Sequence, residues 1–324
     1  MTGPRVALIG AGQMGSLHAR VLAQSPRCEF VTIVEPRREV GAPIADTYGA
    51  QWQPDFADLA GVDAVVVAAA TPAHYAIAGH VIDLGKPVLV EKPLAATYEE
   101  SCDLVARSQQ ADMPLVCGLL ERFNPAVRTA RAIVGEVVQI NGIRHSPFVP
   151  RITTGVATDL LIHDVDLAIQ LVGEDPVDVK GSFGYFHQTS KDNQAEDCAD
   201  ATMGFASGAV ATISASRASQ RKVRQLAIME LGRLIEIDLL RRDITIYHHV
   251  AESLPASGSG YQQQTIIEIP SLQYSEEPLA AQLNHFLDLV TTGNTAEADA
   301  ERNRILPAHR VVHEATESAD TRAR

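Results

Sequence analysis

The chain has 324 residues, a formal net charge of −13, 46% apolar residues and 21% charged residues. This composition is ordinary for a folded globular protein, and the length suggests about two domains. The acidic balance argues against a general nucleic-acid partner, which would favour a basic face. The longest apolar run, 64–70, is too short to cross a bilayer, so we expect no membrane partner.

The first 120 residues alternate strand and helix signals. We expect apolar strands at 6–9, 29–34, 64–69, 87–90 and 115–118, and helices at 15–23, 74–84 and 98–110. Repeated strand–helix units with apolar strands predict an α/β domain, in which helices cover both faces of a parallel sheet. We assign this first domain to residues 1–121.

The pattern changes after residue 121. We expect helices at 125–133, 158–171, 279–289 and 302–316, and strands at 137–145, 177–186, 199–205, 209–216, 225–230, 234–237, 244–247 and 265–269. Consecutive strands joined by short turns predict a largely antiparallel sheet in a second domain, 122–324. The segment 251–261 is rich in Ser, Gly and Pro and is expected to form an exposed loop.

A GxGxxG sequence follows directly on the first expected strand. Gly10 permits a tight turn, Gly12 lets a pyrophosphate approach the backbone, and Gly15 lets helix and strand pack closely. The pyrophosphate is then expected at the N-terminus of the next helix, beside Gln13 and Met14. The alternative is a glycine turn without a ligand, but the position between a strand and a helix favours a dinucleotide.

Glu35 ends the second expected strand, 20 residues after Gly15. This is the position of an acid that accepts hydrogen bonds from the ribose hydroxyls, and its carboxylate would repel a 2′-phosphate. NAD is therefore the expected cofactor. Arg37 and Arg38 leave NADP open, because they would clamp a 2′-phosphate if Glu35 turned away. They are otherwise two solvated loop arginines.

Lys92 follows the apolar strand at 87–90, between Glu91 and Pro93. Ligands of open α/β sheets bind outside the carboxyl ends of the strands, so this lysine is placed to reach a substrate hydroxyl or carbonyl. Pro93 restricts Lys92 to an extended conformation. Taken alone, Lys92 would more simply be a surface lysine at a strand end.

Asp159 and His163 stand four residues apart in an otherwise apolar helical pattern, with Asp166 close to the same stripe. Residues at this spacing share one helix face, and polar groups on such a face line a pocket or pair with each other. A histidine–carboxylate pair also suits a metal ion. No further ligand cluster completes such a site, so no metal is expected.

Together, Glu91-Lys92-Pro93, the glycine fingerprint and the Asp159/His163 pair resemble the glucose–fructose oxidoreductase/inositol 2-dehydrogenase (Gfo/Idh/MocA) family. The resemblance covers nearly the whole chain. It implies an N-terminal Rossmann domain that binds a nicotinamide dinucleotide, and a C-terminal α+β domain with an open-faced, mostly antiparallel sheet. It also implies homodimers or homotetramers built through that sheet, and a last helix that can pack back on the Rossmann domain.

The same resemblance implies site residues. Thr71, Pro72 and His74 resemble the family's loop beside the cofactor, and Glu91 belongs to the same cofactor-binding set. Lys92 and the Asp159/His163 pair would be catalytic and would also bind the substrate, with a cis peptide bond before Pro93.

The implied chemistry is transfer of a hydride between a sugar hydroxyl carbon and NAD. His163 is the preferred general base, because the ordinary pKa of a histidine lies close to neutral pH. Asp159 would anchor a substrate hydroxyl or orient His163, and Lys92 would stabilise the developing alkoxide. Lys92 and His163 can exchange roles, and the sequence does not separate the two assignments.

A polar cluster stands where the chain enters the second domain. Arg122 is a candidate substrate ligand and Asn124 a candidate cofactor ligand, although a linker salt bridge before a helix explains both equally well. Arg144 and Arg151 flank a stretch that resembles the family's UDP-N-acetylglucosamine 3-dehydrogenases, and they would meet a diphosphate or carboxylate. The expected substrate is therefore a nucleotide-linked hexose oxidised at C3.

Other substrates and functions stay open. A simpler polyol such as inositol or a sugar phosphate would suit the same groups. An NADPH-dependent reductase of a keto-sugar or imine is a second possibility, and an NAD-sensing regulator is the non-enzyme alternative. Four scattered cysteines without a CxxC pair are typical of reduced structural thiols, and the N-terminus reads directly into a strand. We therefore expect a cytoplasmic protein.

Overall fold

The computed structural model of the chain describes residues 3–149, 154–253, 261–272 and 276–319. The chain divides into two compact units. The first contains Met1–Leu120 and Glu276–Arg310, and the second contains Glu121–Ser275 and Val311–Arg324. The sequence predicted a single boundary after residue 121. The structure differs, because the C-terminal segment Glu276–Arg310 belongs to the N-terminal unit.

The first unit has a six-stranded parallel sheet in the order β3-β2-β1-β4-β5-β6. The strands are β1 (Arg5–Ile9), β2 (Glu29–Val34), β3 (Gln51–Gln53), β4 (Ala64–Val67), β5 (Val88–Val90) and β6 (Leu115–Cys117). Strands such as β4 are buried along their whole length, as expected where helices cover both faces. The strand order reverses beside β1, and open α/β sheets bind ligands at such a point.

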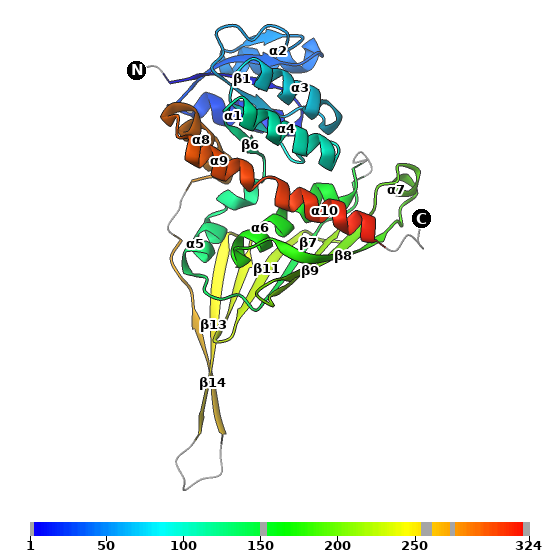
Figure 1. Cartoon of the computed structure of the whole chain (residues 1–324), viewed down its shortest axis with the longest axis vertical. Helices are drawn as coiled ribbons and strands as arrows, with labels where there is room; N and C mark the ends of the chain where they lie inside the picture. The colour runs from blue at the N-terminus through cyan, green and yellow to red at the C-terminus, as the bar shows by residue number, and fades with distance from the viewer. Residues whose placement is uncertain (1–2, 150–153, 254–260, 273–275, 320–324) are drawn as a thin grey trace. The chain divides into compact units, whose positions relative to one another are not determined.

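The helices that lie wholly within the described part of this unit (Figure 1) are α1 (Gln13–Gln24), α2 (Arg38–Tyr48), α3 (Thr71–Asp83), α4 (Tyr98–Gln110), α8 (Pro278–Thr292) and α9 (Thr295–Asn303). The α8 helix joins this unit because its apolar side chains pack into the sheet's core. Leu283 and Phe286 share one buried cluster with Val6 and Leu8. This packing explains why the contacts group α8 with the N-terminal half of the chain.

The second unit has an eight-stranded sheet in the order β14-β13-β12-β11-β7-β10-β9-β8. Its strands are β7 (Gln139–His145), β8 (Pro176–Gly184), β9 (Cys198–Phe205), β10 (Val210–Ser216), β11 (Val223–Glu230), β12 (Arg233–Asp238), β13 (Asp243–Ser253) and β14 (Tyr261–Glu268). The described pairs are antiparallel except β7 with β10, which is parallel. The expected α/β fold with a mostly antiparallel second sheet is confirmed.

The helices of this unit include α5 (Pro125–Ile133), α6 (Ile162–Val172) and α7 (Gln188–Asp192), with short helices η1 (Leu120–Phe123) and η2 (Ala157–Leu161). A Cβ added to Gly142 on β7 would lie 3.6 Å from the Cβ of Asp164 on α6, so α6 packs directly on the sheet. Burial alternates along β10, with one face covered and the other partly exposed. The sheet is therefore open on one face.

Several expected elements differ from the structure. The helix expected at 302–316 corresponds to α10 (Leu306–Ser318) and the last two residues of α9, so most of α9 was not predicted. The elements α2, β3 and α7 were not predicted either. The expected loop at 251–261 is wrong at both ends, because β13 runs to Ser253 and β14 starts at Tyr261. Residues 254–260 lie outside the described residues. In Figure 1, β13 and β14 continue together past the end of β12.

Gly and Pro explain why α2 was missed. Gly41 and Pro43 both lie inside it, and these residues are usually read as helix breakers. Pro43 is the sixth residue of the helix, where a proline lacks the amide that would donate to the carbonyl four residues back. In the ranges that the structure describes, no helix is both long and apolar enough to cross a membrane.

Candidate active site

A cavity of about 600 Å³ opens at the carboxyl ends of β1, β2 and β4. Its lining contains the glycine fingerprint and the acid that follows β2: Gly10, Gly12, Gln13, Met14 and Glu35. Ala69, Ala70 and Ala73 close another side. The first turn of α1 has no acidic residue, and its N-cap Gly12 offers no side-chain cap. The amide groups and the dipole at this helix end suit an anionic ligand group.

The three glycines fit a dinucleotide in three different ways. Gly10 has φ +102°, and an added Cβ would lie 2.5 Å from the carbonyl oxygen of Ala68. A Cβ on Gly15 would collide with the carbonyl oxygen of Gly10, so helix and strand need glycine there. A Cβ on Gly12 would meet no protein atom within 4 Å. Because Gly12 lines the cavity, that open space is available to a ligand, as the fingerprint predicts.

Glu35 is buried at the edge of this cavity, with both carboxylate oxygens in use. Oε2 accepts a hydrogen bond from the Ala11 amide at 3.1 Å, and Oε1 accepts from the Arg37 Nε at 2.6 Å. The hydrogen bond from Arg37 lowers the pKa of Glu35 below its ordinary value. The Trp52 Nε1 also donates to the Glu35 carbonyl, at 2.9 Å. Glu35 therefore faces the cavity as an anion and has not turned away from it.

The two arginines expected to compete for a phosphate both have partners within the protein. Arg37 pairs with Glu35, and the Arg38 guanidinium lies 5.3 Å from the Trp52 ring centre in a cation–π contact. With the carboxylate in place at the fingerprint position, this arrangement favours an unphosphorylated ribose.

Thr71, Pro72 and His74 form the first turn of α3, beside the cavity-lining alanines. His74 is 1% exposed, and its ring nitrogens lie 2.9 Å from the Pro93 carbonyl oxygen and 3.0 Å from that of Ala69. The structure contradicts direct cofactor binding by His74, because its ring is enclosed by backbone. Thr71 and Pro72 do not line the 600 Å³ cavity, and their roles stay a prediction.

Lys92 comes two residues after the end of β5 and is half-buried. Its peptide bond to Pro93 is cis, as the resemblance implies. Glu91 is buried, and its Oε1 lies 2.7 Å from the His18 Nε2. This contact turns the Glu91 carboxylate into the protein, so the structure contradicts its assignment as a direct cofactor ligand.

Asp159 lies in η2, a single π-helical turn, and His163 lies at the start of α6. Isolated π turns are frequent at functional sites. The Asp159 Oδ2 accepts a hydrogen bond from the Arg217 Nη2 at 2.6 Å, and the other end of that guanidinium donates to the Thr154 carbonyl. Arg217 is 4% exposed, whereas the Asp159 side chain is 28% exposed. A buried cation thus holds a partly accessible carboxylate.

Sequence reasoning missed Arg217. It stands 58 residues from Asp159, directly after β10, with no local signal to connect the two. Residues 3–149, 154–253, 261–272 and 276–319 contain no group of three His, Cys, Asp or Glu residues that could hold a metal ion.

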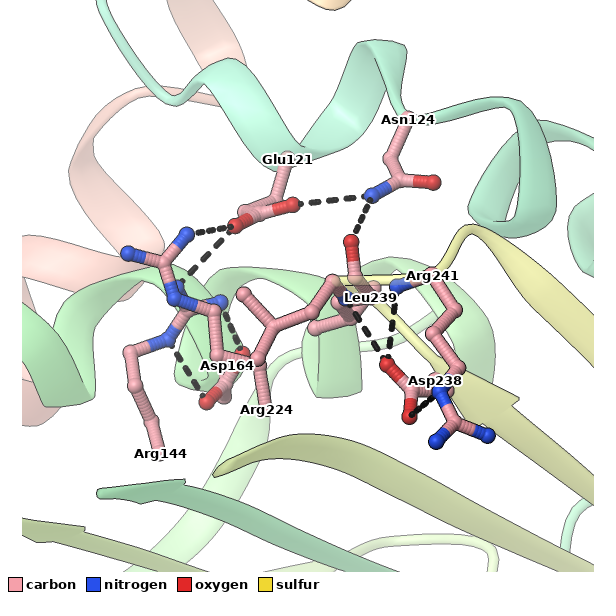
Figure 2. A network of polar contacts seen from close by, with 9 residues as sticks. Glu121, Asn124, Arg144, Asp164, Arg224, Asp238, Leu239 and Arg241 are labelled. Atoms are coloured by element: carbon pink, nitrogen blue, oxygen red, sulfur yellow. Dashed lines mark hydrogen bonds and ion pairs between the residues drawn. The ribbon is translucent and has the colours of Figure 1, made fainter. Parts of the chain in front are cut away.

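Arg144 is not a substrate ligand. Figure 2 shows it between two carboxylates: its Nε and Nη2 donate to both oxygens of Asp164, at 2.9 and 2.6 Å, and its Nη1 donates to Glu121 at 3.0 Å. The Arg144 side chain is 2% exposed and that of Asp164 is fully buried. Burial alone would lower the pKa of Arg144, but the two carboxylates raise it above its ordinary value. The substrate assignment of Arg144 is therefore wrong.

Arg122 and Asn124 are also structural. Arg122 makes a two-pronged, buried ion pair with Asp166, at 2.8 and 2.7 Å. Asn124 caps α5 through the Ala126 amide, and its Nδ2 lies within hydrogen-bond distance of Glu121 (Figure 2). The expected substrate role of Arg122 and cofactor role of Asn124 are both contradicted. Arg151, the remaining candidate, lies outside the described residues.

Comparison with known proteins agrees with this geometry. Residues 4–118 match the oxidoreductase family with an NAD-binding Rossmann fold, and residues 128–234 match the GFO/IDH/MocA C-terminal domain. The chain is 30% identical over 303 residues to UDP-N-acetylglucosamine 3-dehydrogenase of Acidithiobacillus ferrooxidans, covering 93% of each protein. A solved structure of that enzyme superposes with a TM-score of 0.82 at 29% identity, covering 97% of this chain and 98% of that one.

A second relative is scyllo-inositol 2-dehydrogenase (NAD(+)) of Bacillus subtilis, which is 26% identical over 310 residues, 90% of this chain and 87% of that protein. The similarity thus extends along both units and includes the fingerprint that lines the cavity. The chain belongs to the Gfo/Idh/MocA family of oxidoreductases, and its Rossmann unit binds NAD.

Proposed function

We propose that the chain is an NAD-dependent dehydrogenase that oxidises C3 of a nucleotide-linked hexose such as UDP-N-acetylglucosamine. The observation that carries this proposal is the similarity to UDP-N-acetylglucosamine 3-dehydrogenase along 93% of both chains. The side chains at Lys92, Asp159 and His163 suit the chemistry. Oxidation of a secondary alcohol needs a hydride acceptor and a group that takes the hydroxyl proton.

Each of the three residues has a distinct task in this proposal. NAD, when bound, accepts the hydride from the sugar carbon. His163 takes the hydroxyl proton, and Lys92 donates a hydrogen bond that stabilises the negative charge on the same oxygen. Asp159 anchors a neighbouring hydroxyl. Its ion pair with Arg217 supports this task, because the pair holds the carboxylate in one orientation.

Recognition of a diphosphate needs cations other than Arg144 and Arg122. Two exposed cations, Arg221 and Lys222, follow Arg217 in the connection between β10 and β11. We infer that this connection contributes to binding a charged substrate group. The B. subtilis relative, named for an uncharged inositol, makes inositols the main alternative substrates.

The test is a turnover assay with NAD on a panel of UDP-hexoses, inositols and sugar phosphates. We expect K92M and H163N each to lower kcat by about 10²- to 10⁴-fold, the range of a lost acid–base group. The Kd for NADH should change less than about twofold in both variants, because neither side chain is part of the pyrophosphate cradle.

Two variants serve as matched controls. Lys86 stands just before β5, at the strand end opposite Lys92, and its Nζ bonds the Val62 carbonyl at 2.6 Å. K86M should keep its kcat, and so should H285N on α8. Wild-type rates in both K92M and H163N would remove the catalytic assignment, and turnover of inositols alone would replace the proposed substrate.

We also infer a homodimer or homotetramer formed through the open face of the second sheet. The partial exposure of Ile143 and Val210 on this face, 38% and 39%, supports the inference. Light scattering of wild type and I143E would test it: the charged variant should shift the mass toward the monomer. An unchanged mass would exclude this face.

A further inference from the structure

The segment Glu91–Leu94, which carries Lys92, is contacted by three buried histidines from three different helices. His18 lies on α1, His74 on α3 and His309 on α10. All three belong to the first unit, and their exposures are 2%, 1% and 6%. We call these three residues the histidine clamp. Buried polar side chains are costly unless they are hydrogen-bonded, so their partners indicate what they are for.

His18 acts on the segment through Glu91. Its Nε2 lies 2.7 Å from the Glu91 Oε1, and the Glu91 Oε2 accepts the Lys92 amide at 3.3 Å. A Cβ on Gly118 would lie 2.8 Å from that same Oε2, so the glycine leaves room for the carboxylate. Because α1 begins at the glycine fingerprint, this contact joins the helix that holds the pyrophosphate to the residue before Lys92.

His74 holds the other side of Lys92. Its Nδ1 lies 2.9 Å from the Pro93 carbonyl oxygen, and its Nε2 lies 3.0 Å from the carbonyl oxygen of Ala69. Ala69 lines the dinucleotide cavity. The ring therefore spans from the cavity wall to the residue after Lys92.

His309 completes the clamp at Leu94. The Leu94 amide donates to the His309 Nε2 at 3.0 Å, and the His309 Nδ1 lies 2.8 Å from the Ile305 carbonyl oxygen. An amide can only donate, so Nε2 is the acceptor and the ring proton sits on Nδ1, where it bonds Ile305. The two contacts fix both the tautomer and the orientation of the ring.

We propose that His18, His74 and His309 are positioning residues for Lys92. The clamp rests on the proposed function, in which Lys92 stabilises the charge on the substrate oxygen. Lys92 lies beyond the last residue of β5, where the ladder no longer fixes the backbone. The clamp supplies that restraint from both sides. Displacing a reacting group by about 1 Å can cost about 100-fold in rate, so small shifts of this segment matter.

The experiment compares leucine with glutamine at two clamp positions. In both His18 and His309 the contacting atom is Nε2, and a glutamine amide can replace it, as a donor to Glu91 or as an acceptor from Leu94. We expect H18L and H309L to lower kcat by about 10- to 100-fold while KM and the Kd for NADH change less than about threefold. H18Q and H309Q should recover most of kcat.

Hydrogen exchange gives a readout that needs no substrate. In H309L the Leu94 amide loses its acceptor, so it should exchange about tenfold faster, the effect of losing roughly 1.4 kcal/mol of protection. H309Q should restore the slow exchange. His285 supplies the matched control, because it lies on α8 of the same unit and its partner, the Glu301 Oε2 at 3.3 Å from its Nε2, belongs neither to the segment 91–94 nor to the cavity lining. H285L should leave kcat and the exchange of Leu94 unchanged.

The outcomes separate the clamp from the proposed function. One outcome would overturn the clamp and leave the proposed function intact. In it, H309L exchanges the Leu94 amide faster but keeps a wild-type kcat, while K92M inactivates the enzyme. An equal loss of kcat in H285L, or no recovery in either glutamine variant, would also overturn the clamp. Full activity in K92M would instead remove the proposed function. Should one leucine variant fail to fold, the other leucine variant and both glutamine variants decide the result.

Discussion

Each unit contains an arginine that the sequence offered as a ligand for an anionic group, and the fold treats the two differently. In the first unit, Arg37 pairs with Glu35 at the edge of a cavity, and its side chain is 60% exposed. In the second unit, Arg144 is 2% exposed and lies between Asp164 and Glu121. The first pair can exchange partners with a ligand, whereas the second can only hold the protein together.

Chain distance explains why the sequence did not distinguish them. Glu35 and Arg37 are two residues apart, and both are recognisable from the fingerprint. The partners of Arg144 are 20 and 23 residues away, on different elements. Whether an arginine is available to a ligand depends on which carboxylates the fold brings to it, and a single sequence does not contain that information.

The largest expected effect comes from breaking the buried pair. Arg144→Met would leave Asp164 and Glu121 buried without their main cation, which costs about 3–5 kcal/mol in comparable pairs. We expect the free energy of unfolding, measured by urea denaturation, to fall by that amount. Arg144→Met protein that stays folded should keep the wild-type KM for its substrate.

Arg241→Met is the control for this variant. Arg241 contacts Asp238 at 3.9 Å and is 78% exposed, so its loss should change stability by less than about 1 kcal/mol. A stable Arg144→Met protein with a higher KM for its substrate would contradict the structural role and restore the sequence hypothesis.

A smaller effect separates two glycines of the fingerprint. Gly15→Ala places a Cβ against the Gly10 carbonyl oxygen, and such overpacking typically costs about 1–3 kcal/mol. Gly12→Ala places its Cβ in open space at the cavity, so stability should change by less than about 1 kcal/mol. We expect Gly12→Ala instead to weaken NADH binding by roughly tenfold or more, because the methyl group occupies ligand space.

Thermal unfolding and NADH titration measure the two effects side by side. Equal destabilisation by both alanine substitutions, or unchanged NADH affinity in Gly12→Ala, would contradict the assignment of Gly12 to the ligand. Both substitutions lie in the same six-residue turn of the first unit, so their comparison does not depend on the second unit.

Local patterns were sufficient for most of the fold. Period and turn signals predicted the bounds of β2, α4 and α5 as the structure has them, since their apolar faces and caps are encoded within each segment. The sequence failed where local signals were weak or absent. It missed α2, which contains Gly41 and Pro43, and it missed most of α9, the helix before α10.

The candidate site shows the same difference between local and distant signals. The fingerprint and Glu35 were predicted, because each depends on residues close together in the chain, whereas the cis bond before Pro93 was implied by the resemblance to the family. Arg217, His18 and His309 were missed, because their partners lie 58, 73 and 215 residues away. His74 was noticed but given the wrong task, since its contacts with backbone carbonyls leave no trace in a sequence pattern.

A modest effect is expected from neutralising the exposed pair. Glu35→Gln keeps the shape of the side chain and removes the charge that repels a 2′-phosphate, so Arg37 and Arg38 become available to NADP. We expect the ratio of Kd for NADP to Kd for NAD to fall by about tenfold, roughly 1.4 kcal/mol. Stability should change little, because the partner Arg37 is largely exposed. An unchanged ratio would mean that Glu35 does not select the cofactor.

The smallest expected effect is the pH dependence of NAD affinity, and its direction follows from the lowered pKa of Glu35. The hydrogen bond from Arg37 lowers the pKa of this carboxyl below its ordinary value of 4.5. A carboxyl with a lower pKa in the folded protein contributes stability above its ordinary value, and this contribution is lost as pH falls through the folded value. Because the ionised carboxylate is the form that accepts hydrogen bonds from the ribose hydroxyls, we expect NAD affinity to stay constant between about pH 5 and 8 and to weaken only at more acidic pH, where Glu35 becomes protonated.

Trp52, the only tryptophan of the chain, provides the measurement, because its indole donates to the Glu35 carbonyl and should transfer energy to bound NADH. Glu35→Gln should abolish the acidic decline while leaving the plateau flat. If the wild-type affinity instead changed with a midpoint between about pH 5 and 8, and Glu35→Gln removed that midpoint, the carboxyl would titrate near neutrality. The hydrogen bond from Arg37 would then not keep Glu35 ionised at neutral pH. This result would contradict the role assigned to the exposed Glu35–Arg37 pair in its contrast with the buried Arg144 pair.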